Sequence, residues 1–224
     1  MMAAENSNEK ALSPAVSTAA GRSWPARHPL LFTFLLSAVI VWGIGAVTYI
    51  YFYPHLIFNA WERGIVNHGL GTAANPIPPG GIPLNTLYAM PDLASPTANS
   101  NLLASGNHDT LYTAGFLDLS KEPEVLHVPD MAGRYYAVQF IDSFWDVFDY
   151  VGRRTTGTQA GDFLITGPGW RGTVPAGLTQ ISSPDNTVML IGRVLVESDS
   201  DLATAYGLSK QIQITPLGHW QPGQ

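Results

Sequence analysis

The chain has 224 residues, of which 46% are hydrophobic and only 12% are charged, and its formal net charge at pH 7 is -6. It contains no cysteine, which excludes a disulfide scaffold, a zinc or iron–sulfur site held by cysteines, and a cysteine nucleophile. The acidic balance argues against a nucleic-acid-binding protein, because such proteins neutralise phosphates with a surplus of lysine and arginine. An average domain carries about 25% charged residues, so this composition needs a cause.

An uncharged apolar segment near the N-terminus accounts for part of the low fraction of charged residues. No Asp, Glu, Lys or Arg occurs from Pro29 to Ala60, and nearly all of the 24 residues from Leu30 to Tyr53 are apolar. As an α-helix those residues measure about 36 Å, and a membrane's hydrocarbon core is about 30 Å thick. We predict a transmembrane helix over residues 29–58. The alternative, a cleaved signal peptide, has a shorter apolar region of about 7 to 15 residues that ends in small side chains.

The charges that flank this helix predict its orientation. Lys10, Arg22 and Arg27 precede it, whereas Arg63 is the only cation in about the next thirty residues. Positive charges resist translocation, so we expect the N-terminus to stay inside and the rest of the chain to face the periplasm or the exterior. Residues 1–28, which lack hydrophobic periodicity, are predicted to form a disordered cytoplasmic tail.

The region after the helix divides into two parts. Residues 59–106 are predicted to be a linker and irregular loop region, because prolines and glycines crowd residues 75–83; residues 84–90 could form a helical turn or two. Residues 107–224 show short apolar or alternating segments separated by turn signals. The predicted strands cover residues 110–119, 124–128, 134–142, 147–151, 162–166, 178–182, 187–196 and 211–214, with one helix over residues 198–210. This pattern favours a mainly β fold, an antiparallel β-sandwich or jelly roll.

Several polar clusters in the sequence are candidate sites of chemistry. Asn107-His108-Asp109 is the densest, but the histidines and carboxylates have no metal-binding spacing, so no metal and no cofactor is predicted. We expect Asn107 and Asp109 to hydrogen-bond the backbone where a strand begins. Gly167 to Gly172 spaces its glycines like a phosphate-binding loop, but no helix follows, so that function is rejected.

Two further stretches leave alternatives open. Two of Asp130, Asp142, Asp146 and Asp149 could pair for glycoside hydrolysis. The last three are more simply edge and turn residues of the segment from Ile141 to Tyr150. The aromatic side chains between Phe140 and Tyr150 could stack on sugars, although filling the core is favoured. The pair Arg153-Arg154 could grip an anion or pair with the acidic stretch before it.

Residues 107–217 resemble the bacterial domain-of-unknown-function 1254 family. The resemblance rests on long segments, among them NHDTLYTAGFLDLSKEP, RYYAVQFIDSFWDVFDYVGRRTTGTQAGDFLITGPGW, IGRVLVES and QITPL. It implies a double β-sandwich protein in which this domain is joined to a second, 1214-type module, and it implies no established reaction. That module is not recognised after Leu217, so we expect the partner to be a separate 1214-type chain or another membrane complex.

The sequence is therefore compatible with two functions. The first is a non-catalytic accessory subunit, anchored in the bacterial inner membrane, whose outward-facing β-sandwich assembles with a partner protein. The alternative is an envelope enzyme or binding protein acting on glycan or lipid-linked material. Its candidate ligand or interface residues are Asn107, Asp109, Tyr112, Arg134, Asp142 and Arg153. Convergence of Asp109, Arg134 and Arg153 on an open pocket would favour the alternative, and their use in strand-end hydrogen bonds would favour the accessory subunit.

Overall fold

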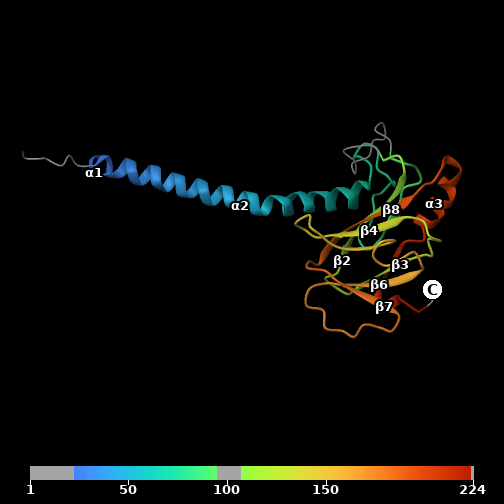
Figure 1. Ribbon diagram of the computed structural model, residues 1–224. Helices are drawn as coiled ribbons and strands as arrows, with labels where there is room; N and C mark the ends of the chain where they lie inside the picture. Colours follow the sequence, from blue (N-terminus) through green and yellow to red (C-terminus); the bar gives the residue numbers. More distant parts are fainter. Residues whose placement is uncertain (1–22, 95–106, 223–224) are drawn as a thin grey trace, which may run out of the picture. The chain divides into compact units, whose positions relative to one another are not determined.

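A computed structural model of the chain describes residues 23–94 and 107–222, which fall in two compact units, Met1–Tyr49 and Ile50–Gln224 (Figure 1). Most of the tail predicted over residues 1–28, and the segment 95–106 of the predicted loop region, lie outside the described residues. The last residues of the predicted tail include a short helix, α1 (Trp24–Arg27).

The second helix, α2 (Pro29–His68), contains the predicted membrane segment. It is long and apolar enough to cross a membrane, and no side chain of its most apolar stretch is buried within the protein. The helix was predicted to end at residue 58, but it continues ten residues further, to His68. The reason is packing: Phe58 and Ile65, seven residues apart on one helical face, are both buried against the β-domain.

The domain contains two sheets. The larger has the strand order β1-β2-β8-β4-β5 and the smaller the order β7-β6-β3-β9. The strands are β1 (Tyr88–Ala89), β2 (Thr110–Asp118), β3 (Glu124–Val128), β4 (Tyr136–Ile141), β5 (Val147–Gly152), β6 (Gly161–Thr166), β7 (Leu178–Ser182), β8 (Thr187–Leu195) and β9 (Gln213–Pro216). Between β8 and β9 lie a 3-10 turn, η1 (Asp199–Asp201), and a helix, α3 (Leu202–Ser209); a second 3-10 turn, η2 (Leu217–His219), follows β9.

The predicted sandwich is confirmed, with one exception to its antiparallel character. Strands β2 and β8 pair antiparallel over their full length, from Thr110↔Leu195 to Asp118↔Thr187. Strand β7, in contrast, runs parallel to β6. The connection between them, residues 167–177, has glycine and proline at several positions and is long enough to carry the chain back along the sheet before β7 begins.

The core lies between the two sheets, and alternation along each strand builds it. Val138 and Phe140 of β4 meet Leu126 and Val128 of β3 and Ile165 of β6 in one buried cluster. Side chains two apart point to the same face of a strand, so this alternation is what the period-two pattern predicts.

The other face of the larger sheet is buried as well. Phe58 and Ile65 of α2 form a second cluster with Tyr112 and Phe116 of β2 and Met189 of β8. Strand β2 is therefore covered on both sides, which explains why its residues from Thr110 to Leu117 are all buried.

The segment after α2 is tied to the end of that helix. Ile82 donates its backbone N–H to the carbonyl of Ile65 at 3.0 Å. Gly81 has a φ of +78°, and a Cβ placed there would lie 2.0 Å from the carbonyl oxygen of Val66, so only glycine fits this approach. Residues 84–90 contain β1 rather than the predicted helical turn, because Tyr88 and Ala89 pair with β2.

Candidate functional site

The sheet register brings four of the six predicted site residues to one end of the larger sheet. The backbone carbonyl of Asp109 accepts the backbone N–H of Val196 at 2.7 Å, and the backbone N–H of Arg153 donates to the carbonyl of Tyr136 at 3.1 Å. Asn107 and Arg134 lie at the same end, next to β2 and β4. Neighbouring strands lie about 4.8 Å apart, so the row from β2 to β5 is about 14 Å wide.

Two of these four side chains are committed to structural contacts. The Asn107 amide donates to the carbonyl of Thr110 at 2.9 Å, and its Oδ1 accepts the Thr110 N–H at 3.2 Å, which fixes the start of β2. Arg134 forms an ion pair with Asp201 in which Nη1 donates to Oδ2 and Nη2 donates to Oδ1, the latter at 2.8 Å. Nη1 also donates to the carbonyl of Leu195 at 2.7 Å.

The ion pair is partly buried and links β4 to η1. The Arg134 guanidinium and the N–H of Glu197 both donate to the Asp201 carboxylate, and these hydrogen bonds lower the pKa of Asp201 to about 2. The same side-chain hydrogen bond raises the pKa of Arg134. Both charges are therefore fixed at any physiological pH, and the guanidinium donors are directed at protein groups.

The side chains of Tyr112 and Asp142 also make contacts that hold the fold, whereas that of Arg153 makes none among the described residues. Tyr112 is buried beneath α2, and the Arg193 guanidinium lies 5.0 Å from its ring centroid. Asp142 lies at the opposite end of the sheet, where its carboxylate accepts the N–H groups of Phe144 and Asp146 at 2.9 and 3.0 Å. Arg153 is exposed, while its neighbour Arg154 lines an adjacent cavity of about 310 Å³.

A polar cluster that the sequence did not suggest lies on the smaller sheet. His127 and Asp162 are register partners on β3 and β6, with His127 Nδ1 2.7 Å from Asp162 Oδ1. The Trp220 indole N–H donates to Asp162 Oδ2 at 3.3 Å. With Nδ1 held by the carboxylate, Nε2 is the ring nitrogen available to a ligand.

This cluster borders a shallow cavity of about 250 Å³. Its lining comprises His127, Asp162, Gln211, Gln213, Thr215 and Trp220. An oriented imidazole, an indole, amides and a hydroxyl suit a neutral ligand with several hydroxyl groups. Among residues 23–94 and 107–222, no three His, Cys, Asp or Glu side chains form a group that could hold a metal ion.

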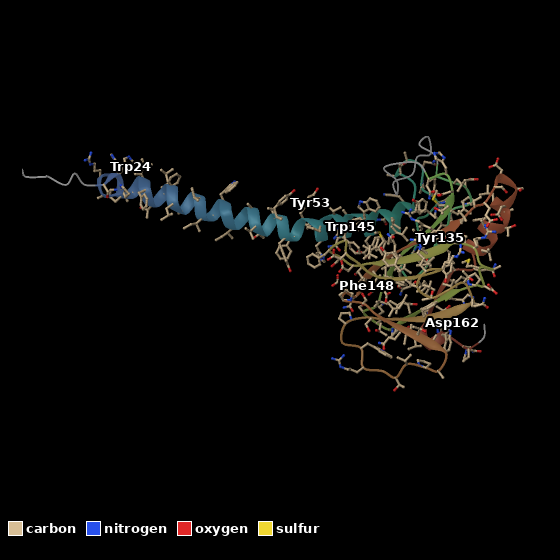
Figure 2. All side chains as sticks on the ribbon, in the orientation of Figure 1. Trp24, Tyr53, Tyr135, Trp145, Phe148 and Asp162 are labelled. Atoms are coloured by element: carbon tan, nitrogen blue, oxygen red, sulfur yellow. The ribbon has the colours of Figure 1, made fainter. Side chains whose placement is uncertain are left out.

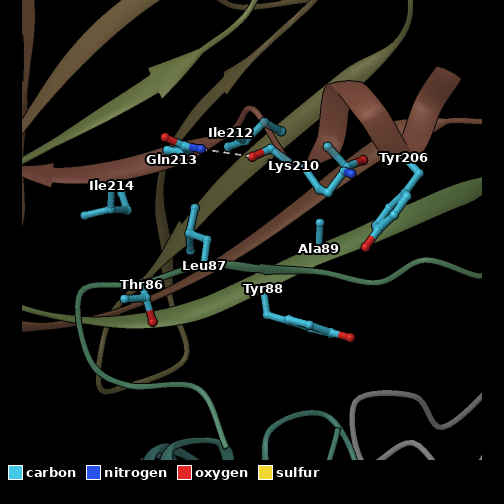
Figure 3. Close-up of a pocket in the computed structure, with 10 residues that line it drawn as sticks. Thr86, Leu87, Tyr88, Ala89, Tyr206, Lys210, Ile212, Gln213 and Ile214 are labelled. Atoms are coloured by element: carbon cyan, nitrogen blue, oxygen red, sulfur yellow. Dashed lines mark hydrogen bonds between the residues drawn. The ribbon is translucent and has the colours of Figure 1, made fainter. Parts of the chain in front are cut away.

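A larger groove, of about 360 Å³, is lined by residues of β1, α3 and β9 (Figure 3). One wall is β1 and the residues before it, and the other is α3 and the start of β9. Figure 3 shows Leu87 below Ile212, with Ile214 to its left and Tyr206 to its right. The Lys210 ammonium lies 4.6 Å from the Tyr206 ring centroid. Both β1 and β9 are the last strands of their sheets, so this groove has a sheet edge on each side.

One buried carboxylate lies away from all of these cavities. Glu124 begins β3 and is only 1% exposed, and its Oε2 has no hydrogen-bond partner among the described residues. Burial, with smaller contributions from Glu122 and Asp118, raises the pKa of Glu124 to about 7.

Comparison with solved structures finds partial similarity. The VPA0106 protein from Vibrio parahaemolyticus is 32% identical, with the match covering 53% of this chain and 32% of that protein at a TM-score of 0.48. An uncharacterized protein from Burkholderia cenocepacia is 13% identical, with coverages of 61% and 36% and a TM-score of 0.36. The chain thus spans about a third of the length of these two proteins.

No curated protein matches the chain. The sequence profile described as "Protein of unknown function (DUF1254)" matches residues 84–216, which is more than half of the 224 residues. The match begins just before β1 and ends with β9, so it contains both sheets and confirms the resemblance seen in residues 107–217. The chain therefore belongs to the DUF1254 family.

Proposed function

We propose that this protein is an accessory subunit anchored in the bacterial inner membrane, with its N-terminus inside and its β-sandwich on the periplasmic side, where it assembles with a partner protein. The length and composition of α2 support the anchor. The surplus of basic residues before the apolar stretch supports the orientation. The use of Asn107, Arg134 and Asp142 in hydrogen bonds that hold the fold favours assembly over chemistry at those residues.

The observation that carries the assembly proposal is the groove between β1 and α3. Its apolar floor and its two sheet edges suit an extended segment of another chain, which can hydrogen-bond to an unpaired strand edge while its side chains enter the groove. The partner we favour is a chain that bears the 1214-type module; another membrane complex is the second choice.

Site-specific photocrosslinking of the full-length protein in its native membrane tests this proposal. A benzophenone amino acid at Tyr88, which lines the groove, should crosslink to one stoichiometric partner. The same group at Tyr150, which is exposed on the strand at the other edge of the larger sheet, is the matched control and should not. A monodisperse monomer with no crosslink from Tyr88 would contradict the proposal.

The purified partner allows a second measurement. Lys210→Glu, at an exposed position in the groove, should weaken binding of that partner, whereas Arg171→Glu, in the exposed connection after β6, should leave it unchanged. Equal affinities of the two variants would place the contact elsewhere.

The cluster around His127 supports a second candidate function, the binding of a glycan. Sugars are recognised by an aromatic side chain together with planar hydrogen-bonding groups, and Trp220, His127 and the nearby glutamines provide these. Titration calorimetry with chitooligosaccharides should detect binding that His127→Gln abolishes and that His219→Gln, an exposed control, preserves. No heat at millimolar sugar would remove this candidate for that class of glycan.

A further inference from the structure

The turn between β4 and β5 is held unusually firmly for a surface turn. The Asp142 carboxylate accepts the backbone N–H groups of Phe144 and Asp146, and Asp142 and Asp146 are also joined through their backbones at 3.0 Å. Asp185, from the loop before β8, accepts the backbone N–H of Ser143 at 3.0 Å and its hydroxyl hydrogen as well. The turn therefore has one defined conformation.

This conformation directs Trp145 onto α2 (Figure 2). Trp145 has a φ of +68°, a region that costs a side-chain-bearing residue about 1 to 3 kcal/mol. Its indole N–H donates to the carbonyl of Pro54 at 3.1 Å, and its ring packs edge-on against Phe58 and Trp61 with centroids 5.8 and 5.3 Å away. The turn is thus fixed to the helix at Pro54.

The neighbouring residue, Phe144, has no comparable cover. Its ring lies 5.6 Å from that of Tyr51, within the apolar stretch, and 5.9 Å from that of His55, about one helical turn further along α2. Phe144 is nevertheless 38% exposed, and Val147, at the start of β5, is 39% exposed. We call these two side chains and Tyr51, which is 60% exposed, the turn patch; all three are apolar or aromatic and open to the surroundings.

The sequence places this patch at a definite membrane depth. The apolar stretch ends at Tyr53, and the aromatic residues from Tyr49 to Tyr53 are of the kind that mark the boundary between hydrocarbon and headgroups. Because Phe144 contacts Tyr51, it must lie close to that boundary whenever the stretch spans a bilayer. Given the proposed membrane anchor, we infer that the turn patch docks the β-domain on the membrane surface, with Phe144 in the headgroup layer.

The charges around the patch indicate which lipids it accepts. The acidic residues Asp146 and Asp149 are exposed on either side of Val147 in the sequence. Anionic headgroups would repel them, and burial of the carboxylates in hydrocarbon would be costly, so the patch enters a zwitterionic headgroup layer and no deeper.

Spin labelling tests this inference cleanly, because the chain has no native cysteine. The full-length protein is placed in phosphatidylcholine nanodiscs with a nitroxide at Phe144→Cys or Val147→Cys. Thr179→Cys, exposed on β7, is the aqueous control, and Val41→Cys, within the apolar stretch, reports on the anchor. Accessibility to oxygen and to a water-soluble nickel chelate gives the depth of each label.

We expect the Val41 label in the hydrocarbon, the Thr179 label in water, and the Phe144 and Val147 labels at the depth of the headgroups. Replacing a third of the lipid with phosphatidylglycerol should move the two patch labels toward water. If Phe144 and Val147 are as accessible to nickel as Thr179 while Val41 is deep, the docking inference is wrong and the anchor stands. If Val41 is itself in water, the proposed anchor fails first.

Discussion

The substitution Glu124→Gln measures how much ionisation of the buried Glu124 carboxyl group, at the start of β3, destabilises the folded state. The pKa of Glu124 is about 7, against an ordinary value of 4.5, because burial disfavours its charged form. A raised carboxyl pKa means that the folded state holds its proton more tightly than the unfolded state. The resulting cost to folding is absent below about pH 4.5, grows between pH 4.5 and pH 7, and is complete above pH 7.

The size of the cost follows from the shift. Each pKa unit corresponds to about 1.4 kcal/mol, so a rise from 4.5 to about 7 destabilises the ionised protein by up to about 3 kcal/mol. Glutamine has nearly the same shape but never ionises. The variant should therefore match the wild type at pH 4.5 and exceed its stability by up to about 3 kcal/mol at pH 8, which for a protein of this size is a rise in Tm of roughly 6 to 12 °C.

Differential scanning calorimetry of the full-length proteins in a mild nonionic detergent at pH 4.5, 6 and 8 measures the difference. Glu122→Gln is the matched control: Glu122 is exposed, so its removal should change the pH dependence much less. If the wild type and Glu124→Gln lose stability in parallel between pH 4.5 and pH 8, the carboxylate is not desolvated in the folded state and the reasoning is refuted.

Three other substitutions test the packing of the domain. Phe58→Ala removes a fully buried ring from between Phe116 and Trp145, and should lower the free energy of unfolding by about 3 to 5 kcal/mol. The loss is measured as a lower calorimetric Tm and a weaker near-ultraviolet circular dichroism signal, and an unchanged Tm would mean that α2 does not pack there. Arg134→Met should destabilise the domain by about 2 kcal/mol at pH 7. The wild type should lose the stability due to the ion pair as the pH falls from 3.8 through about 2, and the variant should lack that loss in urea titrations at each pH. Identical acid profiles would count against the ion pair. Gly81→Ala should lower the free energy of unfolding by about 1 to 3 kcal/mol in the same titration, because Gly81 has a positive φ and lies against the carbonyl of Val66. An unchanged stability would show that this loop can move away.

Local patterns were sufficient for most of the strands. Alternation in RYYAVQFID and the turn signals around Glu124 to Val128 placed β3 and β4 within a few residues of their observed bounds. These features depend on each segment's own periodicity and on glycine and proline, which act over a few residues. The eight predicted strands all occur, and β1 was missed because its two residues are extended only through pairing with β2.

Features that depend on pairing between distant segments were not accessible. The parallel direction of β7 depends on the path of residues 167–177, and nothing in the strand itself encodes it. Helix α2 extends ten residues past the predicted end, because the length needed to span a membrane does not limit a helix whose Phe58, Trp61 and Ile65 have helical spacing.

The candidate sites show the same limit. Asn107, Asp109, Arg134 and Arg153 share one end of the sheet only because β8 lies between β2 and β4, an order that no local pattern reveals. His127 faces Asp162 because β3 pairs with β6 across 35 residues, so the cluster becomes visible only with the register. The alternation of His127 with buried neighbours on β3 was the one available signal, and it does not name a partner.

The pairing of β2 with β8 has a consequence for when the domain folds. These central strands lie at residues 110–118 and 187–195, so the larger sheet cannot close until residue 195 has been synthesised. The apolar helix emerges from the ribosome much earlier, and we expect it to reach the membrane while the remaining chain is still unfolded. Nascent chains arrested at residue 180 should be integrated but protease-sensitive beyond the helix, and protection of their β2 region would show that folding does not wait for β8.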